Sequence, residues 1–175
     1  MILPFKTKHN GQPTHFVKKI WDGYDFHKHP DFNIFYDACE KYGFDFSKGY
    51  HPKPHTIRED KNNRWKPGVM IDFFINRARK NMFRFAPRIP VISTQKIKIE
   101  YDKSDPVKEL AKVSVYIDDK LFYYESDTRI PASFELYEKM LMFARNDGFN
   151  NIVEFFSWFN EDFSGKIIHW TDLKY

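Results

Sequence analysis

The chain contains almost no cysteine and has no long apolar run. Cys39 is the only cysteine among 175 residues, which excludes an intrachain disulfide and gives no sign of an oxidising compartment. The first residues carry no apolar run of signal-peptide length, and no later stretch approaches the roughly 20 apolar residues of a membrane-spanning helix. We therefore expect a cytoplasmic protein with no membrane partner.

Linker-like segments are also missing. No internal repeat, low-complexity tract or Gly/Ser/Pro-rich stretch divides the chain, and its length suits one compact domain with its own core. The composition, 42% hydrophobic and 30% charged, is that of an ordinary globular protein. The sequence thus predicts a single domain over residues 1–175. A formal charge of +4 tolerates a polyanionic partner without requiring one.

Aromatic residues are the feature in excess. Phe, Tyr and Trp make up 19% of the chain, more than a small core usually needs. Two interpretations stay open: a Phe-rich core of the kind an A/T-rich genome encodes, or rings that face a ligand.

Apolar residues at helical spacing predict helices near both ends of the chain. Thr14, Asp31 and Ser133 stand where N-terminal caps are expected, and Gly23 and Gly148 stand at predicted helix ends. The expected helices cover residues 16–21, 32–42, 134–143 and 151–159. Residues 25–50 form a helical insertion between the first helix and the strands that follow.

Short β-type runs fill the middle of the chain. Asp118-Asp119 offers a tight turn inside the run 112–124, which predicts a hairpin. Gly165 precedes a final expected strand at residues 166–170. The other expected strands cover residues 55–59, 69–75, 82–85 and 89–101. Together the pattern predicts an α+β fold, a small mixed β-barrel flanked by helices.

The segment Lys53-Pro54-His55-Thr56-Ile57-Arg58 is the most informative part of the sequence. Because side chains alternate along a strand, Thr56 and Arg58 share one face, and Lys53 approaches from the preceding turn. Cations beside a hydroxyl suit an anion or a polarised carbonyl. We expect the chemistry of the protein to centre here.

This segment resembles the opening of an ASCH domain, a relative of the PUA β-barrel. The family motif is Gly-x-Lys-x-x-Glu-x-Arg, and here His51, Lys53, Thr56 and Arg58 stand at its four defined positions. A threonine at the third position is similar to the bacterial acetylcytidine amidohydrolase branch, in which the lysine, this threonine and a distant glutamate are catalytic. Glu154 best matches that glutamate, whereas His51 departs from the family glycine.

Three functions follow from the resemblance and the composition. The first is recognition of RNA or a modified nucleoside in a basic cleft, through Lys53, His55, Arg58, Arg64, Trp65, Arg77, Arg79 and Lys80. The second is hydrolysis of an acetyl amide on a nucleoside, with Thr56 as nucleophile, Lys53 as base and Glu154 as proton donor. The third is a protein-interaction module of a phage or mobile element, which binds its partner through residues 25–50.

Each candidate residue also has a plain structural interpretation. Lys53 and Arg58 could be solvated strand charges, and residues 77–80 a solvated hairpin tip. Asn151 and Glu154 have the spacing of a capping box, in which the glutamate serves only the helix start. The histidines at 27, 29, 51 and 55 have no carboxylate or cysteine at a diagnostic spacing, so we expect no metal and no cofactor.

Overall fold

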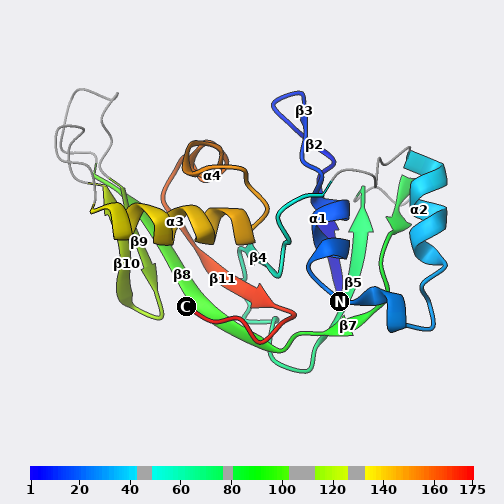
Figure 1. The fold of residues 1–175 in the computed structure, drawn as a ribbon. Coiled ribbons are helices and arrows are strands. Elements are labelled where there is room, and N and C mark those ends of the chain that lie inside the picture. The colour runs from blue at the N-terminus through cyan, green and yellow to red at the C-terminus, as the bar shows by residue number, and fades with distance from the viewer. Residues whose placement is uncertain (43–48, 77–80, 103–112, 126–132) are drawn as a thin grey trace.

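The protein has a mixed α+β fold, shown in Figure 1. The computed structural model describes residues 1–42, 49–76, 81–102, 113–125 and 133–175. The helices are α1 (Phe16–Asp22), α2 (Ile34–Tyr42), α3 (Phe134–Asn146) and α4 (Ile152–Trp158), with a 3₁₀ turn η1 (Phe26–Lys28). The strands are β1 (Ile2–Phe5), β2 (Lys8–His9), β3 (Gln12–Pro13), β4 (His55–Arg58), β5 (Met70–Ile75), β6 (Phe83–Arg84), β7 (Ile89–Pro90), β8 (Ser93–Tyr101), β9 (Val113–Ile117), β10 (Lys120–Glu125) and β11 (Phe163–His169).

The strands form three open sheets. The largest is five-stranded and antiparallel, in the order β10-β9-β8-β11-β4. A second sheet has β5 paired with β1, β6 and β7, and β2 with β3 form a hairpin. None of these sheets, as far as the described residues go, closes into a barrel, so the expected barrel is not confirmed. The reason is that β4 pairs with β11 and β5 with other strands, so the two larger sheets pack together without joining.

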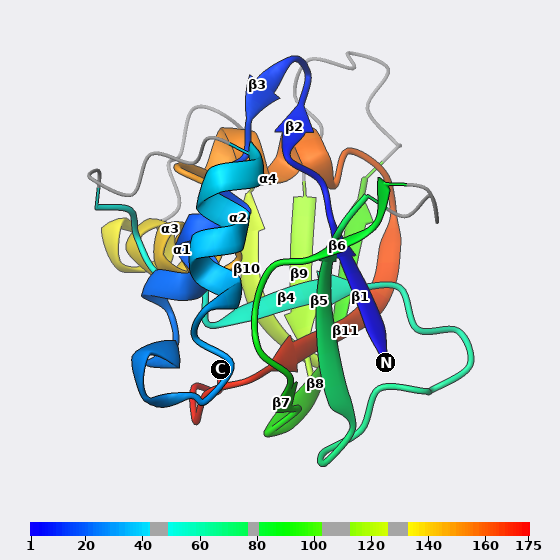
Figure 2. The ribbon, with the colours of Figure 1, turned by 90° about the vertical axis from the view of Figure 1, so that its right-hand side faces the viewer.

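The core lies on both sides of the five-stranded sheet. One face is covered by α3 and α4, where Phe143 and Phe155 are fully buried and contact each other with ring centroids 5.7 Å apart. The four-stranded sheet lies at the end of the large sheet away from the β9–β10 hairpin, and α1 and α2 lie next to this smaller sheet (Figures 1 and 2). There Phe73 packs edge-on against Trp170. The excess of aromatic residues is therefore used largely in the core.

Two of the predicted helix caps are confirmed. The Ser133 hydroxyl accepts a hydrogen bond from the Leu136 amide, and the Asn151 side chain accepts one from the Glu154 amide at 2.8 Å. Local sequence was sufficient here because a cap bonds only to its own helix.

The predicted cap of α1 is wrong by one residue. His15 stands at the cap position with a φ of 54° and makes no capping bond, whereas Thr14 donates its hydroxyl to the Lys6 carbonyl at 2.7 Å. Thr14 also donates its amide to the Thr7 carbonyl at 3.0 Å. The chain enters α1 from the β2–β3 hairpin, so the Thr14 hydroxyl bonds across the hairpin and accepts from the Phe16 amide only at the long distance of 3.5 Å.

The predicted hairpin in residues 112–124 is confirmed as β9 and β10, with Asp118 and Asp119 at positive φ in the turn. The role predicted for Gly165 is wrong, because this glycine lies inside β11. A Cβ at Gly165 would lie 2.4 Å from the Arg58 carbonyl oxygen. Glycine therefore allows β11 and β4 to approach closely, and it does not begin the strand.

The helical segment near the N-terminus contributes to the core. Phe26 is fully buried, and Trp21 of α1 contacts Phe32 and Phe35 with ring centroids 5.8 and 4.8 Å away. Tyr36 is 61% exposed. Residues 43–48 of the expected insertion lie outside the described residues. The described part thus covers α1 with most of its rings and leaves Tyr36 on the surface.

Candidate functional site

Lys53 forms a buried ion pair. Its side chain is 1% exposed, and its ammonium donates to Asp147 Oδ1 at 2.6 Å and to the Asp147 carbonyl. The same carboxylate oxygen accepts from the Ile57 amide at 3.2 Å. A Cβ on Gly148 would come within 3.0 Å of the Lys53 side chain. This pair joins the segment before β4 to the turn between α3 and α4.

Burial shifts both partners of this pair toward their neutral forms. It lowers the pKa of Lys53 to about 8, against the opposing effect of Asp147. It raises the pKa of Asp147, against the opposing effect of Lys53. A lysine with such a pKa has the basicity of a general base. Its nitrogen, however, is occupied by Asp147 and shielded from solvent, so no substrate reaches it in this conformation.

Thr56 and Arg58 share one face of β4, as the alternation predicts, but that face is covered. Thr56 is 1% exposed, and its hydroxyl has no hydrogen-bond partner within the described parts of the chain. The Arg58 guanidinium donates to the Pro4 carbonyl of β1 at 3.1 Å and lies 4.9 Å from the centre of the Phe5 ring. Both side chains therefore point toward the four-stranded sheet.

Glu154 completes the start of α4. Its carboxylate accepts hydrogen bonds from the amide and the side-chain nitrogen of Asn150, at 2.9 to 3.1 Å. No hydrogen bond or ion pair between described atoms joins any two of Lys53, Thr56 and Glu154. The structure does not bring the three expected catalytic residues together on one substrate site.

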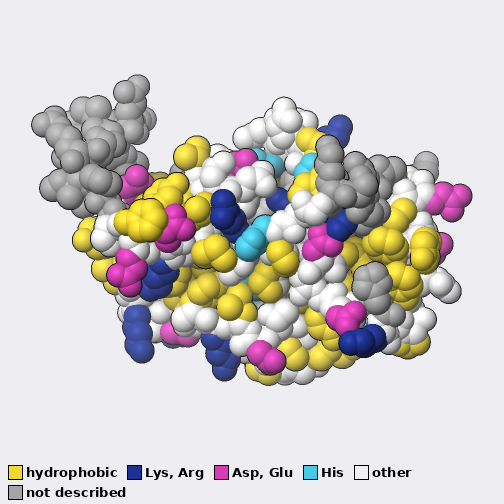
Figure 3. Space-filling model, viewed as in Figure 1, with side chains coloured by type: hydrophobic (Ala, Val, Ile, Leu, Met, Phe, Trp, Pro, Cys, Tyr) yellow, Lys and Arg dark blue, Asp and Glu magenta, His cyan; other side chains and the backbone are white. Residues whose placement is uncertain are grey.

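The other residues expected in a basic cleft are dispersed. His55 is fully buried, with Nε2 2.7 Å from the Tyr175 hydroxyl, and Trp65 is a core residue at 4% exposure. Arg64 is exposed. The remaining members, Arg77, Arg79 and Lys80, lie outside the described residues. On the face shown in Figure 3, basic and acidic side chains are interspersed.

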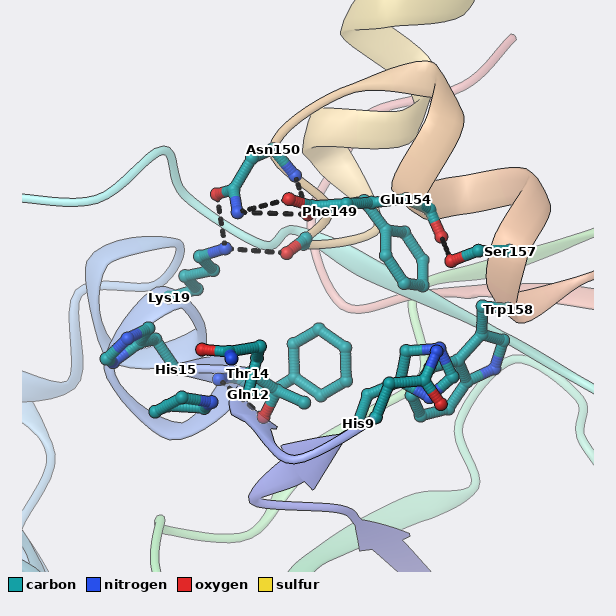
Figure 4. A pocket seen from close by; sticks show the side chains of 14 residues that line it. His9, Gln12, Thr14, His15, Lys19, Phe149, Asn150, Glu154, Ser157 and Trp158 are labelled. Carbon is teal, nitrogen blue, oxygen red and sulfur yellow. Dashed lines mark hydrogen bonds between the residues drawn. The ribbon is translucent and has the colours of Figure 1, made fainter.

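A cavity of about 380 Å³ lies instead between the β2–β3 hairpin, the start of α1 and the segment that leads into α4 (Figure 4). Sequence reasoning missed it because its two halves are far apart in the chain and neither carries a motif. Its lining includes Glu154, the one expected catalytic residue that reaches it. The other lining residues are His9, Asn10, Gln12, Pro13, Thr14, His15, Phe16, Lys19, Gly148, Phe149, Asn150, Ser157 and Trp158.

One end of this cavity is a polar corner made by Lys19, Asn150 and Glu154. Lys19 is 3% exposed, and its ammonium donates to the Gly148 carbonyl at 2.7 Å and to Asn150 Oδ1 at 3.2 Å. Burial lowers the pKa of Lys19, and the charge of Glu154 opposes that shift. Figure 4 shows the Lys19 nitrogen and the Glu154 carboxylate on either side of Asn150. The corner offers a cationic donor and an anionic acceptor close together.

The other walls of the cavity are aromatic. Trp158 of α4 lies against His9 with ring centroids 4.5 Å apart, and it meets Phe16 and Phe149 edge-on at 5.9 and 5.7 Å. Lys6 Nζ lies 5.0 Å from the centre of the Trp158 ring. Flat apolar walls beside a polar corner are the composition of a small-molecule site.

The described residues contain no group of three or more His, Cys, Asp or Glu side chains arranged to hold a metal ion. None of the helices in the described ranges has the length and apolar character needed to cross a bilayer. No protein-family model matches the chain, and neither curated proteins nor solved structures provide a significant match.

Proposed function

We propose that this protein binds the base of a modified nucleoside in the cavity between the β2–β3 hairpin and α4. The observation that carries the proposal is the Lys19–Asn150–Glu154 corner beside the aromatic walls. A nucleobase has a flat face that stacks on rings and an edge where acceptors and donors alternate. Lys19 would donate to a ring nitrogen or carbonyl, and Glu154 would accept from a neighbouring N–H.

The size and charge of the site favour a single nucleoside over a polymer. A volume of about 380 Å³ lies at the lower end of the range for small-molecule pockets, roughly 300 to 1,000 Å³. Among the residues that line the cavity, Lys19 is the one Lys or Arg and Glu154 the one Asp or Glu, so the lining itself has no net excess of cations to attract several phosphates. Binding of a neutral nucleoside would therefore change little with salt, whereas RNA binding would weaken steeply.

The ASCH resemblance and its PUA-like barrel belong to the same proposal. Two observations support it: the motif segment forms β4, and β4 pairs along its length with the late strand β11. In this proposal Lys53 would hold β4 in place through Asp147, while Lys19 and Glu154 would contact the ligand.

Calorimetric titration with a panel of nucleosides, including cytidine and acetylcytidine, tests the proposal. Lys19→Met should weaken binding at least about tenfold, since a hydrogen bond to a charged group contributes roughly 1.5 to 3 kcal/mol. Lys18→Met is the matched control, because Lys18 is next in sequence but pairs with Asp22 and does not line the cavity. Thermal melting would establish that both variants fold.

The outcomes separate the three candidate functions. No saturable binding of any nucleoside, or equal loss in the Lys18 and Lys19 variants, would refute the proposal. Release of free cytidine from acetylcytidine, detected by chromatography, would favour the amidohydrolase. Binding to single-stranded RNA alone, with strong salt dependence, would favour RNA recognition outside the cavity. Residues 25–50 are the segment to test for a protein partner if all of these results are negative.

A further inference from the structure

Strand β10 is an edge of the five-stranded sheet as far as the described residues go. Among the described strands, β10 pairs with β9 alone, and Figure 1 shows it at the outer end of that sheet. Unpaired backbone groups on such an edge are a template for another strand. The strand has no proline, and it exposes large side chains: Leu121 is 54% and Tyr124 45% accessible.

A β-bulge gives β10 an unusual pattern of faces. Leu121 stands opposite Tyr116 and Tyr123 opposite Val115, so Phe122 is the extra residue. Consecutive side chains of a regular strand point to opposite faces, but here Phe122 and Tyr123 are both buried, at 5% and 3% exposure. The buried pair is flanked on each side by an exposed apolar residue. The order of exposed and buried side chains is therefore the same in both directions along the strand.

This symmetry decides how β10 would pair with itself. When two copies extend one sheet antiparallel about a two-fold axis, residues directly opposite each other point to the same face. In a regular strand this condition requires the two-fold axis to pass beside one residue, which then lies opposite its own copy. The bulge permits an axis between Phe122 and Tyr123 instead, because both point inward. Leu121 then lies opposite Tyr124 of the second copy.

The same register brings opposite charges together. Lys120 at the start of β10 lies opposite Glu125 of the second copy, and the two-fold axis repeats the pair. Both side chains are exposed. Opposite charges and apolar pairs directly across a strand boundary each stabilise pairing, while like charges oppose it. Without the bulge, Lys120 and Glu125 would point to opposite faces and could not meet.

Helix α3 adds apolar surface beside this edge. Lys139 of α3 lies 4.2 Å from the centre of the Phe122 ring, so the helix crosses the buried face of β10. Phe134 and Tyr137 of the same helix are 81% and 45% exposed. A two-fold axis at β10 would bring the α3 helices of two copies to the same side of the extended sheet, where these rings could be covered.

We propose that the protein forms a symmetric dimer in which β10 pairs antiparallel with β10 of a second copy, in the register that places Lys120 opposite Glu125. The occupant of the edge is a second copy because the strand is complementary to itself in charge and in face pattern. This inference is independent of what the cavity binds.

Sedimentation equilibrium over a range of concentrations tests the dimer. The parent chain should show a reversible monomer–dimer equilibrium. Lys120→Glu and Glu125→Lys should each weaken dimerisation by about tenfold, because each places like charges opposite each other at two symmetric positions. The double variant with both changes restores opposite charges and should return to within about threefold of the parent. Lys66→Glu, a change of the same charge at an exposed lysine outside the sheets, should have no effect.

Two results would overturn the proposal. Bulges also serve to discourage pairing at sheet edges, and a parent chain that stays monomeric at every concentration would assign that role to Phe122. A dimer that the two charge variants leave unchanged, or that the double variant does not restore, would have a different interface. Circular dichroism of each variant shows that its fold is intact, so that loss of association is not loss of structure.

Discussion

The buried pair of Lys53 and Asp147 allows the sharpest prediction about stability. Lys53→Met leaves a carboxylate in a site where Lys53 and Asp147 are 1% and 3% exposed, and Asp147→Asn leaves an ammonium there without its counter-charge. Breaking a buried pair from either side destabilises proteins by roughly 3 to 5 kcal/mol. We expect a loss of about 3 kcal/mol in the free energy of unfolding for each single variant.

Titration of the remaining partner limits these losses. Neutralising a carboxyl of ordinary pKa 3.8 at pH 7 costs about 4 kcal/mol. Neutralising a lysine of ordinary pKa 10.5 at the same pH costs about 5 kcal/mol. Neither variant should lose more than this through its unpaired charge. The double variant removes both charges of the pair, so its loss should be smaller than the sum of the two by at least about 2 kcal/mol.

The dependence on pH gives the pair a signature that packing effects lack. In Asp147→Asn the pKa of Lys53 falls further, so the unfolded chain binds more protons than the folded one, and stability rises with pH. The deficit of this variant against the parent should therefore shrink between pH 7 and 10. In Lys53→Met the raised pKa of Asp147 makes the folded chain bind more protons, and its deficit should shrink as pH falls toward 5.

Urea unfolding of the parent, both single variants and the double variant at pH 5, 7 and 10 provides the measurement. Additive losses within about 0.5 kcal/mol, together with deficits that do not change with pH, would refute the reasoning. The two residues would then be neutral packing groups, and Lys53 would be available for another role.

Two further predictions concern buried histidines and a glycine at a close approach between strands. His55 and His169 are fully buried, and burial lowers both pKa values, that of His169 to about 4. Because the unfolded chain takes up protons below pH 6.5 and the folded chain does not, the free energy of unfolding should fall between pH 6.5 and 4, by about 2 kcal/mol at pH 5 from His169 alone. Urea unfolding of the parent and of His169→Phe at these pH values checks this prediction. An equal decline in both proteins would contradict it. Gly165→Ala should lower the free energy of unfolding by roughly 2 kcal/mol, since its Cβ would lie 2.4 Å from the Arg58 carbonyl oxygen. Ser164→Ala, at an exposed position of the same strand, is the control and should change little. Equal denaturation midpoints for the two variants would show that β11 and β4 can move apart without cost.

Local features were readable from the sequence because the groups involved are neighbours along the chain. Ser133 and Asn151 cap helices through amides three residues away. Asp118 and Asp119 form the turn that sets the β9–β10 hairpin. The mixed α+β class follows from the same local signals, since the spacing of apolar residues distinguishes helix from strand.

The tertiary structure decided everything that depends on distant segments. Lys53 meets Asp147 across 94 positions in sequence, and Lys19 reaches the Gly148 carbonyl across 129; no local pattern specifies such partners. Thr56 is buried and Arg58 partly buried because a second sheet covers this face of β4. Whether sheets close, which charges are buried and where a cavity remains are all set by packing between segments, which only the folded chain fixes.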